Sequence, residues 1–70
     1  MGDGLPLAPI DRLIRNSGAE RVSEDASQAM AKIIADFVED ISGQALKLAK
    51  HAGRKTIIDT DVRMARRKMV

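Results

Sequence analysis

The sequence predicts an all-α domain in which a long central helix lies between two short helices. Apolar residues recur at spacings of three and four over three segments, the pattern of helices with one buried face. Gly18 and Gly53 follow two of these segments, and glycine often ends a helix in the left-handed conformation. With 70 residues and no cysteine, the chain is expected to form a single domain, residues 1–70, without disulfides.

The first short helix is expected to begin within Leu5–Pro9. Proline is tolerated in the first turn, where backbone N–H groups have no partner in the helix. Ile10, Leu13 and Ile14 then form one apolar stripe, and Gly18 ends the segment. We expect a helix of about 9–11 residues.

The long helix is expected to begin after Ser23, a good N-cap residue, and to end before Gly53. About 28 residues give a length of about 42 Å. Its apolar face is wider than a coiled-coil seam, and two short helices cannot cover both sides of it. A second copy crossing near Phe37 and Ile41 would cover the remainder, so we expect oligomerisation to stabilise the fold.

The last short helix is expected to begin at Asp59 or one residue earlier, after a loop over residues 54–58. Val62, Ala65 and Met69 form its apolar stripe, and basic residues fill most of the remaining positions.

Charge is distributed unevenly along the chain. Residues 1–44 carry four basic and eight acidic side chains, a balance of −4, whereas residues 45–70 carry eight basic and two acidic, a balance of +6. This asymmetry is compatible with a surface for an acidic polymer and equally with an ordinary solvated helix face. Phe37 is the only aromatic residue, so stacking of single-stranded bases is not expected.

Several other functions are not expected from this composition. His51 has no second histidine or cysteine with which to hold a metal, and no serine is matched by a base, so we predict no metal, no cofactor, no small-molecule substrate and no enzymatic activity. No apolar run approaches a membrane span and the N-terminus lacks the features of a signal peptide, so we expect a soluble, intracellular protein.

Three segments resemble the archaeal histones: Leu5-Pro6-Leu7-Ala8-Pro9-Ile10, Gly18-Ala19-Glu20-Arg21-Val22-Ser23, and Leu48-Ala49-Lys50-His51-Ala52-Gly53-Arg54-Lys55-Thr56-Ile57. The similarity covers nearly the whole chain and implies the histone fold, an obligate dimer of interlocked "handshake" helices. The middle of the long helix, Ala35–Asp40, is more individual, the last helix ends at Met69-Val70 without a lysine-rich tail, and Met1–Gly4 precede the usual start.

The resemblance implies that duplex DNA is the partner. Arg21 would enter the minor groove, where negative potential attracts a guanidinium, Thr56 would steady it, and Arg54 and Lys55 would face phosphates. Backbone N–H groups at the start of the first helix, with Arg12 nearby, offer further phosphate ligands. The family also implies an ion pair between Arg54 and Asp61, which would make Arg54 mostly structural.

The same resemblance implies two protein interfaces. The dimer core would contain Ile33, Phe37 and Ile41, with Val22 and Ile57 forming a short backbone bridge between chains. Leu48, His51 and Asp61 stand where the family joins one dimer to the next.

We therefore expect an architectural protein that wraps and compacts duplex DNA as stacking dimers with little sequence specificity, associated with the chromosome in the cytoplasm. A histone-fold subunit of a heterodimeric transcription regulator is the alternative, and a helical protein–protein adaptor is a third possibility. We expect the first because regulatory relatives usually carry added segments and this chain has none beyond the fold. Whether the chain pairs with itself or with a paralogue is left open.

Overall fold

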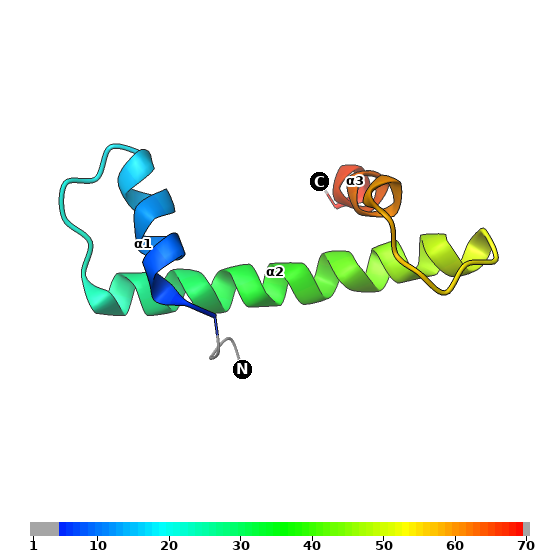
Figure 1. The fold of residues 1–70 in the computed structure, drawn as a ribbon, viewed down its shortest axis with the longest axis horizontal. Coiled ribbons are helices and arrows are strands. Elements are labelled where there is room, and N and C mark those ends of the chain that lie inside the picture. Colours follow the sequence, from blue (N-terminus) through cyan, green and yellow to red (C-terminus); the bar gives the residue numbers. More distant parts are fainter. Residues whose placement is uncertain (1–4, 70) are drawn as a thin grey trace. The chain divides into compact units, whose positions relative to one another are not determined.

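The computed structural model describes residues 5–69, which contain three α-helices and no strand (Figure 1). Helix α1 spans Leu7–Asn16, α2 spans Glu24–His51 and α3 spans Asp59–Lys68. The predicted all-α fold class, with a long helix between two short ones, is confirmed. The features noted at Met1–Gly4 and Val70 lie outside the described residues.

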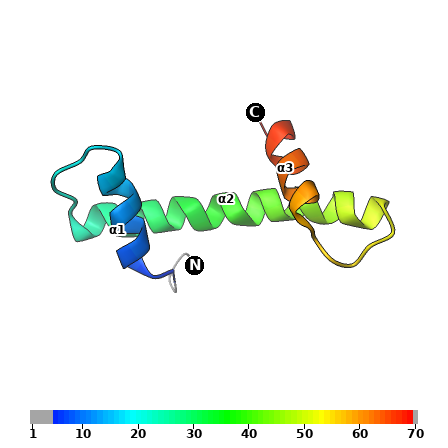
Figure 2. The ribbon, with the colours of Figure 1, turned by 45° about the horizontal axis from the view of Figure 1, so that its top comes forward.

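The chain divides into two packed units, residues 1–36 and residues 37–70. In the first, α1 crosses the first half of α2; in the second, α3 crosses the second half of α2 (Figure 2).

The first unit is built on the apolar stripe of α1. Ile10 is buried, Ile14 is half-buried, and Ser27 and Ala31 are buried on α2. Both buried α2 residues, Ser27 and Ala31, have small side chains. Gly18 ends the α1 segment with φ of 111°, a backbone conformation that residues with a Cβ atom rarely adopt.

The start of α2 is fixed by Ser23, as the sequence predicts. The Ala26 backbone N–H donates to Ser23 Oγ at 3.0 Å, which satisfies one of the unpaired donors at the helix start. Glu24 and Asp25 occupy the first turn, where negative charge is favourable beside the positive end of the helix dipole.

The second unit has a small core in which Ile41 and Ala45 of α2 meet Ala65 of α3, with Leu48 and Met69 packed against them. The expected α3 stripe is partly wrong, because Val62 is 41% exposed and Asp61 is buried at 3%. A periodic pattern assigns residues to the buried or exposed face by polarity alone. It therefore does not predict that a carboxylate such as Asp61 is buried, which requires a partner for its charge inside the fold.

Candidate nucleic-acid interface

The loop between α2 and α3 begins with a tight helix end. Gly53 adopts φ of 77°, and its N–H donates to the Lys50 carbonyl at 2.9 Å. The Arg54 N–H reaches back to the Ala49 carbonyl at 2.8 Å. These two bonds form a Schellman motif, which stops the helix and fixes the direction of the residues that follow.

Arg54 holds this loop through its guanidinium group. Nη1 and Nη2 donate to Asp61 Oδ2 and Oδ1 at 2.8 and 2.9 Å, a bidentate pair, and Nη1 also donates to the Thr56 carbonyl at 3.0 Å. The guanidinium thus joins the start of the loop and its middle, at Thr56, to the first turn of α3. Most of its donors are used within the chain, which favours a structural role over a phosphate contact.

Asp61 is the buried partner of this pair, with its side chain 4% exposed. Besides Arg54, it accepts the Ile58 backbone N–H at 2.9 Å and so caps the start of α3. The hydrogen bonds from Arg54 and then from Ile58 lower the pKa of Asp61 to about 2. In turn, the hydrogen bond to Asp61 raises the pKa of Arg54, so the pair stays ionised.

Lys55 and Thr56 lie at the outer side of this anchored loop, and both are exposed. Within the part of the chain that the structure describes, no ion pair involves Lys55. A free ammonium group beside a rigid backbone is suited to contact a phosphate, because little chain entropy is lost on binding.

The loop between α1 and α2 carries Arg21, which is exposed. Arg15 ties this loop to α1: its Nε donates to Asp11 Oδ2 at 2.8 Å and its Nη1 donates to the Glu20 carbonyl at 3.1 Å. Arg21 therefore follows directly on an anchored residue. Sequence reasoning missed this role of Arg15, for which the spacing of four from Asp11 was the available signal.

Arg12, the remaining predicted phosphate contact, is exposed on α1. The helix begins after Pro6, and its first turn holds no acidic residue. Within that turn no carboxylate opposes the positive end of the helix dipole, a setting that favours an anion; the phosphate contact itself stays a prediction. Arg12 and Arg21 belong to the first unit, whereas Arg54, Lys55 and Thr56 belong to the second.

The predicted dimer core contains the apolar side chains that the chain leaves uncovered. Ile33 is 63% exposed and Phe37 is 45% exposed. Val22 is half-buried and Ile57 is exposed. Ile41 differs from the expectation: it is 7% exposed and already covered by α3 of its own chain, which leaves little of it for a partner.

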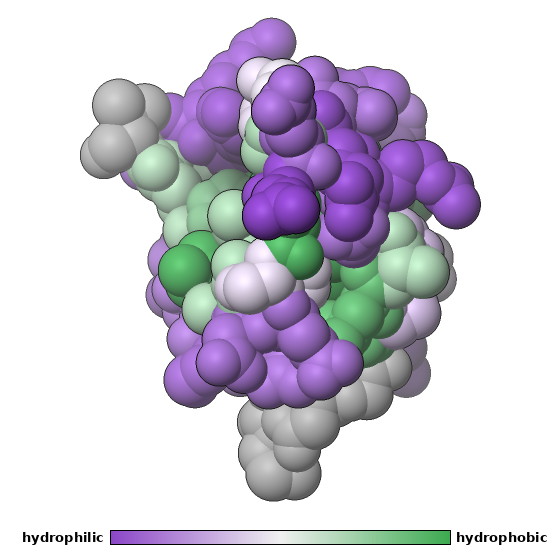
Figure 3. All heavy atoms as spheres, turned by 90° about the vertical axis from the view of Figure 1, so that its left-hand side faces the viewer, coloured by the Kyte–Doolittle hydropathy of each residue, from purple (hydrophilic) through white to green (hydrophobic). Residues whose placement is uncertain are grey.

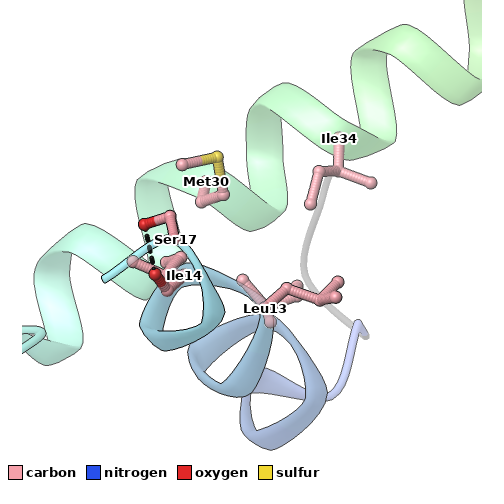
Figure 4. A pocket seen from close by; sticks show the side chains of 6 residues that line it. Leu13, Ile14, Ser17, Met30 and Ile34 are labelled. Atoms are coloured by element: carbon pink, nitrogen blue, oxygen red, sulfur yellow. Dashed lines mark hydrogen bonds between the residues drawn. The ribbon is translucent and has the colours of Figure 1, made fainter. Parts of the chain in front are cut away.

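An apolar groove in the first unit adds to this uncovered surface. It has a volume of about 270 Å³ and lies between α1 and the first half of α2, where Leu13 and Met30 approach Ile34 (Figure 4). Its lining consists of Ile10, Leu13, Ile14, Ser17, Met30 and Ile34. In the space-filling view, apolar side chains reach the surface between hydrophilic ones (Figure 3). Exposed apolar area of this kind marks a surface that binds another protein.

Of the residues predicted to join dimers, Leu48 and His51 lie one turn apart near the end of α2, and Asp61 lies in the first turn of α3. Leu48 is partly buried against the core of its own unit, and His51 is exposed at the last turn of α2. Asp61 is engaged by Arg54 of its own chain, and the contact between dimers stays a prediction.

Neither a membrane segment nor a metal cluster is apparent over residues 5–69. None of these helices combines the length and the apolar content that crossing a bilayer requires. No three histidine, cysteine, aspartate or glutamate side chains in this range are grouped so as to hold a metal ion.

Comparison with known proteins identifies the family. Residues 3–65 match the family model described as "Histone-like transcription factor (CBF/NF-Y) and archaeal histone". The chain is 54% identical over 61 residues to one subunit of the archaeal histone HAN1 from Thermococcus zilligii, and this alignment covers 87% of this chain and 91% of that protein. It is 41% identical over 63 residues to probable archaeal histone 3 of Methanocaldococcus jannaschii, covering 90% and 94%.

A more distant similarity extends to a eukaryotic histone. The chain is 30% identical over 60 residues to the major histone H4 of Tetrahymena pyriformis, and this alignment covers 86% of the chain and 58% of that histone. The three-helix architecture, the anchored basic loops and these similarities agree. The chain therefore belongs to the archaeal histone family, whose members are DNA-binding proteins with a dimerising histone fold.

Proposed function

We propose that this histone is architectural: it binds, wraps and compacts duplex DNA as dimers that stack into larger nucleosome-like assemblies, with little sequence specificity. The observation that carries the proposal is the loop after α2, in which the pair between Arg54 and the buried Asp61 fixes the backbone and Lys55 is left exposed. Preorganised cations bind the DNA backbone without reading bases. The expected location is the chromosome, in the cytoplasm.

In this proposal the dimer completes the DNA site. The first loop of one chain lies beside the second loop of its partner, which brings Arg21 to Lys55 and Thr56. Arg21 enters the minor groove, Thr56 steadies it, and Lys55 and Arg12 contact phosphates. Arg54 acts mainly by holding the loop, because most of its donors are already used within the chain.

Dimers then associate through the end of α2 and the start of α3. Leu48 contributes the apolar surface that its own core leaves exposed, and His51 lies next to it on the last turns of α2. Asp61 contributes less, since Arg54 occupies both of its oxygens. A contact of a few side chains is weak alone, and DNA strengthens it by holding dimers side by side.

A heterodimeric transcription regulator is the second candidate, because the description of the matching family includes histone-like transcription factors. The architectural function is favoured because the two more similar relatives are both named archaeal histones.

The test is the salt dependence of binding to two unrelated duplexes. Log affinity is expected to fall linearly with log salt, by about 0.9 per phosphate neutralised, equally for both duplexes. Lys55→Ala, present twice per dimer, is expected to reduce the slope by about two on both DNAs. Lys32→Ala, whose side chain pairs with Asp36, serves as the control that leaves the slope unchanged. Strong preference for one duplex would favour the regulator, and binding that persists at high salt would contradict both.

A further inference from the structure

The C-terminal end of α3 carries a group of exposed cations that the loop site does not include. Arg66, Arg67 and Lys68 follow one another in the last turn of α3, and all three are exposed. In the part of the chain that the structure describes, no ion pair involves any of them. These three residues form the basic end of α3, which carries more unpaired charge than Lys55 alone supplies to the loop after α2.

The geometry of α3 directs part of this charge away from α2. Ala65 is buried against α2, and Met69 packs against the same core. At about 100° per residue, Arg67 lies about 200° from Ala65, on the outer face of α3. Thr60, Arg63 and Arg67, separated by three and four residues, form this outer face, which contains no apolar side chain. Such a surface suits a polyanion, whereas the centre of a protein interface is usually apolar.

The basic end and the loop after α2 lie on different sides of the second unit. Helix α3 begins beside the loop, crosses α2, and ends on the opposite side of α2 (Figure 2). Its ten residues span about 15 Å. A straight duplex held at Lys55 therefore lies across α2 from the basic end, whose cations are left for another stretch of DNA.

We propose that the basic end of α3 binds the phosphates of a second duplex, so that a dimer bridges two DNA segments while its loops hold the first. This inference rests on the DNA binding of the proposed function and adds a second contact surface. DNA is the polyanion that the family binds, and a protein held on one duplex meets neighbouring DNA at a raised effective concentration. The acidic middle of α2 in another copy is the competing occupant, and the lack of apolar side chains on the outer face disfavours it.

The test uses two short duplexes, one immobilised on beads and one free and fluorescent. Wild type is expected to retain the fluorescent duplex on the beads. Arg66→Gln/Arg67→Gln is expected to reduce the retained amount at least about tenfold, because each chain loses two phosphate contacts. Its affinity for a single short duplex is expected to change by less than about threefold, because the loop site is intact.

Two control variants separate this bridging from other effects of charge. Lys32→Gln/Lys47→Gln removes the same charge from exposed positions of α2 and is expected to keep the fluorescent duplex on the beads. Leu48→Lys/His51→Glu places charge on the proposed contact between dimers. It is also expected to retain the duplex, because bridging through α3 does not require stacked dimers.

The remaining outcomes contradict the inference in different ways. Unchanged retention by Arg66→Gln/Arg67→Gln overturns it and leaves these cations a role at the helix dipole alone. Equal losses of retention and of single-duplex affinity overturn it as well, because the basic end then contacts the first duplex. If the same variant loses oligomers that wild type forms without DNA, measured by sedimentation, the cations bind another copy instead. Failure of wild type to bind a single duplex would refute the proposed function itself.

Discussion

Replacing Phe37 by alanine measures how much of the uncovered α2 surface a second chain buries. The ring is 45% exposed in the single chain. A buried aromatic side chain encloses roughly 200 Å², so about 90 Å² of the ring is left for a partner. At about 25 cal/mol per Å², covering this area contributes about 2 kcal/mol per chain and about 4–5 kcal/mol per dimer.

The assay is the dimer dissociation constant, obtained from sedimentation equilibrium and from the concentration dependence of thermal unfolding. Phe37→Ala is expected to weaken the dimer by about 1,000-fold, since each 1.4 kcal/mol is tenfold. Gln28→Ala, nine residues earlier, lies on the opposite side of α2 at about 100° per residue and is expected to change little. A melting temperature that is independent of concentration in wild type, or an unchanged dissociation constant in the variant, would refute the reasoning.

Two further predictions concern the backbone at Gly43 and the ion pair between Arg54 and the buried Asp61. Gly43→Ala is expected to raise the free energy of unfolding, measured in thermal melts, by about 0.5–1 kcal/mol, because a Cβ at Gly43 meets nothing within 4 Å. A loss of stability would instead show that the backbone of a partner chain approaches Gly43. The pKa of Asp61 is depressed from 3.8 to about 2, so its stabilising contribution is fully present above about pH 4 and is lost as the pH falls through about 2. Asp61→Asn is expected to remove this acid dependence, whereas Asp59→Asn, which breaks an exposed pair with Arg63, is expected to keep it; identical acid unfolding profiles for wild type and Asp61→Asn would contradict the assignment.

The helix boundaries could be predicted because local chemistry decides them. Ser23 supplies an oxygen to the start of α2, and Gly18 and Gly53 adopt the positive φ that ends a helical segment. Each of these effects involves residues a few positions apart, so it can be inferred from the sequence.

The packing of α3 could not be predicted from its periodicity alone. Asp61 is buried because Arg54 reaches it from the other end of the loop, and Val62 is left partly exposed in its place. The sequence predicts Ile41 at the crossing between chains, yet α3 of its own chain covers it. Both outcomes depend on how α3 packs against α2, and a stripe of apolar residues does not specify that packing.

Only part of the candidate DNA-binding site lies within a single chain. The exposure of Lys55 and the anchoring of its loop are properties of one chain. The meeting of Arg21 with Lys55 requires a second chain, and it remains a prediction.

The central claim, that dimers bind DNA and then stack, is tested most directly by nuclease digestion of DNA loaded with the purified protein. Wild type is expected to protect a ladder of lengths that increases by one dimer footprint. The Leu48→Lys/His51→Glu variant is expected to bind DNA and protect only the shortest length, provided that its circular dichroism and dimer mass match wild type. His51→Glu alone keeps the Leu48 contact and is expected to retain part of the ladder. A double variant that protects the same ladder would contradict the stacking surface, and wild type that protects no defined length would contradict the account as a whole.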